Sequence, residues 1–223
     1  MISHLRLMSL ISNSKKKFDQ TVARCEKLVS DYNDIKREHD AGHIEIEPSQ
    51  DLLRAAIVLA VAAFDAYATD CFAEKFVDYV KRFGINAEIE KMLKKAGFDI
   101  GISLELLKAK RPYRRIRTLI DHYYSNYVTE KLEVIDALYK MYSLNDITTN
   151  AARRSRKDEQ RLLGSVQKLV NRRHSIAHDS DYNEHGRLKR VNASDTNRIQ
   201  DLKILVENMD AIVENKFSRN RHH

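Results

Sequence analysis

The residue types best suited to chemistry occur together at residues 173–178 (Arg-His-Ser-Ile-Ala-His). On a helix, residues four apart share one face and residues five apart lie one step round from it, so Arg173 and His178 can converge on one site with His174 beside them. Cleavage of RNA without a metal needs a proton acceptor for the 2′-hydroxyl, a proton donor for the leaving 5′-oxygen and positive charge for the phosphorane. A histidine can fill either proton role near neutral pH, and an arginine can bind two phosphate oxygens. The segment suits this reaction, although the same spacing also occurs at the ordinary polar end of many helices.

The number of such groups bears on the assembly. One chain supplies only one Arg–His pair of this kind. A two-fold dimer that brings two pairs together is a direct way to assemble an acid and a base around one phosphate. We therefore expect a homodimer with a composite active site.

A metal site at the same segment is a second interpretation. His174 and His178 are four residues apart, and Asp179, Asp181 and His185 follow closely. Zinc sites use such histidine pairs, but the glutamate of a His-Glu-x-x-His motif is absent and no cysteine is near. The sequence also has no P-loop, glycine-rich dinucleotide turn or nucleophile elbow. We expect no metal and no cofactor.

Helices are the elements that must position these residues. The chain has 223 residues, of which six are Gly, two are Pro and none is Trp. Few helix breakers, together with many helix-forming residues and no strand-like alternation, favour an all-α fold. The middle of residues 51–83 is apolar on every face, which predicts a long buried helix, covered on all sides, at the centre of a helical bundle.

The remaining elements follow from periodicity and from helix-capping residues. A helix over about residues 157–178 ends at the motif, and a polar loop at 179–186 leads to a final helix capped by Ser194 or Asp195. Residues 3–40 form an amphipathic helix, with a break near Asn13 as an alternative. Residues 103–144 form helical pieces broken at Pro112 and Thr129, and residues 145–150 form a polar connection. We divide the chain into an N-terminal helix (1–42) that packs on the bundle or serves as a dimer arm, a helical domain (43–217) and a tail (218–223).

Two stretches carry a resemblance to a known family. One is residues 170–179 (Val-Asn-Arg-Arg-His-Ser-Ile-Ala-His-Asp), and the other is the long apolar helix that begins at residue 51 and contains Asp65. In both, the chain resembles the HEPN superfamily, in particular the stand-alone bacterial RiboL-PSP-type proteins. The resemblance implies a HEPN-like helical bundle and a metal-independent endoribonuclease that acts as a homodimer and leaves 2′,3′-cyclic phosphate and 5′-hydroxyl ends. It makes Arg173 and His178 the catalytic pair and His174 the polar auxiliary.

The resemblance also bears on biological role. Many such proteins are toxins or phage-defence effectors, so an antitoxin or another regulatory protein is an expected partner besides RNA. The family includes members that do not cleave RNA. A non-catalytic helical module that binds RNA or protein, and a structural protein that assembles through its N-terminal helix, therefore remain as alternatives.

Two further residues are expected to support the motif. Asp65 lies in the most apolar part of the chain, where an unpaired carboxylate would be costly. In one interpretation, Asp65 holds Arg173 or a motif histidine in place. In the other, it forms a structural pair with another arginine, or it lies where that turn of the helix leaves the core. We also place Arg172, the neighbour of Arg173, among the supporting residues.

The positive charge of the chain, +7 overall, points to a polyanionic partner. Three basic blocks could bind phosphates, and four tyrosines could stack on unpaired bases. The alternative is that the blocks are solvated helix faces and the tyrosines cover the core. The blocks are Lys108, Lys110, Arg111, Arg114, Arg115 and Arg117; Arg153, Arg154, Arg156, Lys157 and Arg161; and Arg187, Lys189 and Arg190. The tyrosines are Tyr113, Tyr123, Tyr124 and Tyr127.

Cysteine use and hydropathy bear on location. Cys25 and Cys71 cannot form a disulfide framework, and free buried thiols fit a reducing compartment, so we expect the protein to be cytoplasmic. The most apolar stretch, residues 55–64, is too short to cross a bilayer, which predicts a core helix and no membrane partner.

Overall fold

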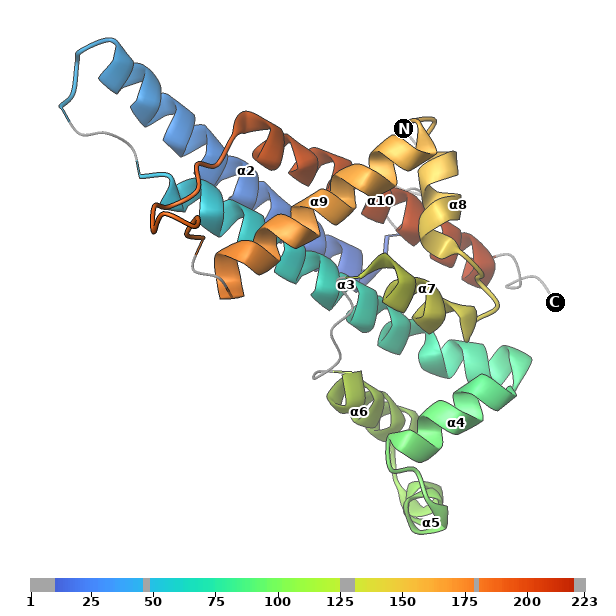
Figure 1. Ribbon diagram of the computed structural model, residues 1–223. Coiled ribbons are helices and arrows are strands. Elements are labelled where there is room, and N and C mark those ends of the chain that lie inside the picture. The colour runs from blue at the N-terminus through green and yellow to red at the C-terminus, as the bar shows by residue number, and fades with distance from the viewer. Residues whose placement is uncertain (1–10, 46–48, 125–130, 179–180, 219–223) are drawn as a thin grey trace, which may run out of the picture.

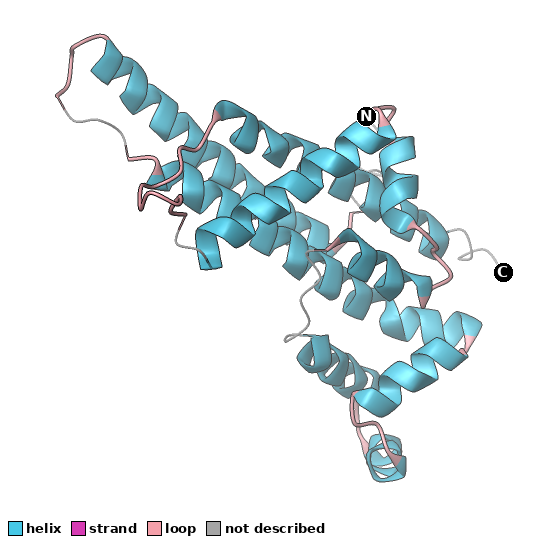
Figure 2. Ribbon diagram, viewed as in Figure 1, coloured by secondary structure: helices cyan, strands magenta, loops and turns pink. Residues whose placement is uncertain are grey.

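The computed structural model describes residues 11–45, 49–124, 131–178 and 181–218, apart from the side chains of Leu107, Arg117 and Asp121. Within these ranges the chain forms nine α-helices and no strand, which confirms the all-α prediction (Figure 2). The helices are α2 (Asn13–Asp40), α3 (Asp51–Phe83), α4 (Ala87–Lys95), α5 (Ile100–Lys108), α6 (Pro112–Tyr124), α7 (Leu132–Lys140), α8 (Ile147–Arg154), α9 (Glu159–His178) and α10 (Ala193–Ser218).

Helix α3 is the centre of the bundle, as its apolar sequence predicts. Helices α2, α6, α9 and α10 all pack against it, and α9 crosses it (Figure 1). Buried tyrosines tie α7 and the turn that follows it to α3, because the hydroxyls of Tyr139 and Tyr142 donate to the backbone oxygens of Ala68 (3.0 Å) and Phe72 (2.6 Å). These bonds satisfy phenol groups that would otherwise be buried without partners.

One face of α3 departs from the prediction that every face is covered. Ala55, Ala62 and Ala66 are exposed in the described chain, and Asp65 and Thr69 lie half-buried along the same stripe. Alanine side chains expose little apolar area, so hydrophobicity alone did not distinguish this face from the buried ones.

The length of α3 also exceeds the ten apolar residues considered above. By length and composition alone it could cross a membrane, because an 18-residue window has a mean hydropathy of 1.6. However, 56% of that window is buried inside the bundle, as in the core helix of a globular protein.

The prediction of a polar connection at residues 145–150 is wrong, because α8 begins at Ile147. Asp136 of α7 caps this helix from outside it: its carboxylate accepts from the backbone N–H (2.9 Å) and the hydroxyl (2.8 Å) of Thr148. Asp146, directly before the helix, is of a residue type that often caps helices, but its own side chain makes no cap hydrogen bond.

Three other boundaries can be compared with the sequence. Helix α2 begins at Asn13, where the alternative break was placed, and the Ser12 hydroxyl accepts from the N–H of Lys15 (3.0 Å). Helix α10 begins at Ala193, one or two residues earlier than its expected caps, because Asp195 accepts from the N–H of Asn192 from inside the helix (3.0 Å). The break at Pro112 is confirmed, and Thr129 lies outside the described residues.

Candidate active site at the end of α9

The motif occupies the last turns of α9. Asp158 caps the start of this helix by accepting from the N–H of Arg161 (2.7 Å). Its buried face, formed by Leu162, Val166, Leu169 and Val170, fixes it on the bundle. The same side chains therefore set the direction in which the polar residues that follow leave the helix.

The structure brings the two motif histidines together. His174 and His178 are both exposed, and their ring centroids lie 4.5 Å apart with 39° between the ring planes. Because both residues are exposed, both rings are accessible to a substrate.

Arg173 lies differently from the histidines. Five residues correspond to a rotation of about 140° along a helix, so the side chains of Arg173 and His178 start out on different sides of α9. Arg173 continues the buried face of α9, and its side chain is half-buried with a buried Nε atom. His178, in contrast, is exposed. The expected convergence of these two residues therefore does not follow from the helix alone.

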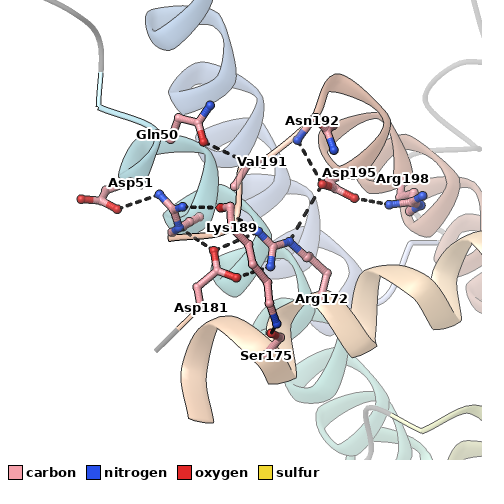
Figure 3. Close-up of polar contacts among 11 residues, drawn as sticks. Gln50, Asp51, Arg172, Ser175, Asp181, Lys189, Val191, Asn192, Asp195 and Arg198 are labelled. Carbon is pink, nitrogen blue, oxygen red and sulfur yellow. Dashed lines mark hydrogen bonds and ion pairs between the residues drawn. The ribbon is translucent and has the colours of Figure 1, made fainter. Parts of the chain in front are cut away.

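Arg172 belongs to a buried ion network that joins α9 to α3 (Figure 3). Both of its terminal nitrogens bind the carboxylate of Asp181, one of them at 2.9 Å, and Nε of Arg54 on α3 binds the same carboxylate at 2.7 Å. The Asp181 side chain is only 1% exposed. Asp181 is thus shared by Arg172, nine positions away in the chain, and by Arg54, 127 positions away.

The charges of this network determine the ionisation of Asp181. Burial alone would raise the pKa of its carboxyl group, but the hydrogen bonds and charges of Arg172 and Arg54 outweigh burial and hold the pKa below its ordinary value. Asp195 extends the network, with an oxygen 3.9 Å from Nε of Arg172 and an ion pair to Arg198. Sequence reasoning considered Asp181 only as a metal ligand, because a pairing with a residue as distant as Arg54 leaves no local signal.

The carboxylate of Asp181 therefore faces arginines. Among the described residues, no group of three or more His, Cys, Asp or Glu side chains could hold a metal ion. Asp65 is half-buried on α3, in the stripe with the exposed alanines. Its proposed role in holding Arg173 or a motif histidine stays a prediction.

The basic blocks differ in their relation to the motif. Of the first, Arg111, Arg114 and Arg115 are exposed at α6, where Arg115 pairs with Glu105 (2.8 Å), and the side chain of Arg117 is not described. The second, with Arg153, Arg154 and Arg156 exposed, lies at the opposite end of α9 from the motif, and Arg153 pairs with Glu159 (2.6 Å) (Figure 1). The third follows the motif directly and is exposed at Arg187, Lys189 and Arg190.

The four tyrosines proposed to stack on bases also differ. Tyr124 is 2% exposed and belongs to the core, so it cannot stack on a base, and Tyr123 is half-buried. Tyr113 is half exposed, with the Nζ of Lys81 3.9 Å above its ring. Tyr127 lies outside the described residues. Of the three described tyrosines, only Tyr113 is exposed, and Lys81 covers one face of its ring.

Comparison with known proteins identifies a family. The model of the family described as RiboL-PSP-HEPN matches residues 20–215, a span that runs from within α2 to within α10. Neither the curated proteins nor the solved structures include a significant match to the chain.

Proposed function

Because the chain belongs to the RiboL-PSP-HEPN family, we propose that it is a metal-independent endoribonuclease. HEPN proteins are generally nuclease-like. The observation that carries the proposal is the exposed pair of His174 and His178 at the end of α9, directly after Arg173. These are the residues of the family's motif, and both rings are open to a substrate.

The reaction we propose uses these groups in defined roles. One His178 takes the proton of the 2′-hydroxyl, the freed oxygen attacks the phosphorus, and the bond from phosphorus to the 5′-oxygen breaks. A second His178 returns a proton to that 5′-oxygen, and Arg173 stabilises the charge of the phosphorane. His174, beside His178, contacts the phosphate or orients the ring of its neighbour. The products are a 2′,3′-cyclic phosphate and a 5′-hydroxyl.

A homodimer is part of the proposal. The side chains of Arg173 and His178 leave α9 on different sides, so a second copy offers a direct way to complete the site. Sedimentation or light scattering should show a dimer. A monomer that cleaves RNA would contradict the composite site.

The biological role that we propose is that of a toxin or phage-defence effector in the cytoplasm, restrained by an antitoxin or another regulatory protein. Uncontrolled cleavage of cellular RNA would stop growth, so such an enzyme needs control. Expression of the wild-type chain should slow growth, and His178→Ala should relieve the effect. Equal toxicity of the two forms would count against a nuclease toxin.

The decisive experiment incubates total RNA with wild-type protein, His178→Ala and Arg173→Ala, and determines the chemistry of the cut ends. We expect each substitution to lower cleavage by about 100-fold or more. His43→Ala is a matched control, because this histidine is exposed and, among the described residues, pairs with Glu38. Cleavage should persist in EDTA. Equal cutting by all variants would refute the proposal, and RNA binding without cutting would favour a non-catalytic module.

A further inference from the structure

The segment after the motif is an ordered hairpin, which the sequence suggested only as a polar loop. Residues 181–191, the 181–191 hairpin, turn back on themselves: the N–H of Lys189 donates to the oxygen of Asp181 (2.7 Å), and that of Asn183 donates to the oxygen of Arg187 (2.8 Å). Tyr182 and Leu188 form an antiparallel bridge between these bonds. The Asn183 side chain closes the tip by accepting from the N–H groups of His185 (3.0 Å) and Arg187 (2.9 Å).

The base of the 181–191 hairpin is fixed to the bundle. Asp181 holds the first segment of the hairpin through Arg54 and Arg172, and its N–H donates to the oxygen of Ser175 on α9 (3.3 Å). Arg54 also donates to the oxygen of Lys189 (2.6 Å), which fixes the returning segment of the hairpin. The N–H of Val191 donates to the Gln50 side chain (3.0 Å), as Figure 3 shows. The hairpin is therefore held in place beside the end of α9.

This anchoring decides which side chains face outward. Asp181 has a left-handed backbone (φ 59°), so the chain turns between this buried residue and the exposed residues that follow it. Tyr182 is 51% exposed and its partner Leu188 is 52% exposed. A large aromatic ring is thus presented to solvent four residues after His178.

The 181–191 hairpin itself carries mainly positive charge, and its Leu188 and Arg190 also line a pocket with Asp40 and Asp51. Arg187, Lys189 and Arg190 are exposed, and Glu184 at the tip is the one exposed carboxylate of the 181–191 hairpin. In the part of the chain that the structure describes, neither Arg187 nor Arg190 forms an ion pair. Both guanidinium groups are therefore available to an anion, unlike Arg115 and Arg153 of the other blocks.

We propose that the 181–191 hairpin is a preformed binding element for single-stranded RNA. The ring of Tyr182 stacks on an unpaired base next to the cleavage position, and Arg187 and Arg190 bind flanking phosphates. The inference rests on the proposed function, because it assigns the substrate class of that same site. An open aromatic ring with adjacent cations suits an unpaired strand, whose bases are free to stack, better than a duplex, whose bases are already stacked.

The test uses the full chain and a labelled single-stranded 2′-O-methyl RNA, which cannot be cut through its 2′-oxygen. We expect Tyr182→Ala to weaken binding by at least about fivefold and Tyr182→Phe to bind as the wild type, because phenylalanine keeps the stacking face. Arg187→Ala should reduce the slope of log affinity against log salt by about 0.7, the loss of one phosphate contact. Lys91→Ala is the control, because it also removes an exposed cation but lies on α4 at the other end of the molecule (Figure 1). It should leave the affinity and the salt slope unchanged.

The outcomes separate this inference from the proposed function. If His178→Ala abolishes cutting of natural RNA but Tyr182→Ala binds as the wild type, the hairpin inference fails and the nuclease stands. If natural RNA is not cut but binding depends on Tyr182, the hairpin stands and catalysis fails. A duplex of the same sequence should bind with no dependence on Tyr182. Failure of the single strand to bind overturns the inference whatever the cutting assay shows.

Discussion

Two of the buried aspartates, Asp181 and Asp210, solve the problem of a buried carboxylate in different ways. Asp181 is 1% exposed and lies between two arginines at the motif end of the bundle. Asp210 is 5% exposed and lies on α10, where it accepts from the hydroxyls of Ser12 (2.5 Å) and Tyr67 (3.4 Å). Burial raises the pKa of both carboxyl groups. Arginine reverses the effect at Asp181, whereas at Asp210 the hydroxyl of Ser12 does not, so its pKa stays above the ordinary value.

The difference reflects what else holds each region. Around Asp210, α2, α3 and α10 pack through buried residues such as Phe18, Tyr67 and Met209, so the polar cluster adds little. The 181–191 hairpin buries only Val191 among its apolar residues, and hydrophobic packing cannot fix it. Ion pairs therefore hold the hairpin in place at the motif end, whereas core packing holds the helices together around Asp210. A loop that carries exposed functional groups can be fixed in this way without covering them.

Removal of the Asp181 carboxylate should have the largest effect on stability. Asp181→Ala leaves Arg54 with only the exposed Asp51 (3.1 Å) and Arg172 with Asp195 at 3.9 Å. We expect a loss of about 3 kcal/mol in the free energy of unfolding, the low end for a broken buried ion pair. Asp210→Ala leaves two hydroxyls that are neutral, and should cost roughly 1–2 kcal/mol. Urea unfolding measures both. Equal losses for the two variants would show that the arginines at Asp181 are stabilised by some other group.

A smaller change tests whether the geometry of the arginine matters. Arg172→Lys keeps the positive charge but loses the planar fork that binds both oxygens of Asp181. We expect a loss of about 1–2 kcal/mol in unfolding free energy and slower cleavage, because the end of α9 and the hairpin lose their common anchor. Arg198→Lys, at Asp195, is the control and should change the cleavage rate little. If the two variants cleave alike, Arg172 has no positioning role.

A contrast between local and long-range contacts also explains how much of the structure could be predicted from the sequence. The long apolar helix and the pairing of His174 with His178 are periodic features, and periodicity is local. Two other features are not local: the bond of Asp136 to the start of α8, and the ion pair of Arg54 with Asp181. Each depends on residues that the fold brings together. The 181–191 hairpin was missed for the same reason: its composition is that of a polar loop, and its order comes from a carboxylate whose partners lie on α3 and α9. Tyr182 could have been noticed as an aromatic residue among cations immediately after the motif.

The smallest expected effect is in the pH dependence, where the two aspartates should behave oppositely. The folded-state pKa of Asp181 is lowered, so its stabilisation is present above the unfolded pKa of about 3.9 and is lost as pH falls through the lower, folded value. The folded-state pKa of Asp210 is raised, so its contribution is full below the unfolded pKa and is lost as pH rises through the higher, folded value. Asparagine resembles the neutral form of each. Asp181→Asn should therefore lose stability relative to wild type as pH rises from about 2 to about 5. Asp210→Asn should gain up to about 1 kcal/mol relative to wild type as pH rises from about 4 to about 7. Unfolding free energies measured in urea across these ranges give both curves, and slopes of the same sign would refute the contrast between the two sites.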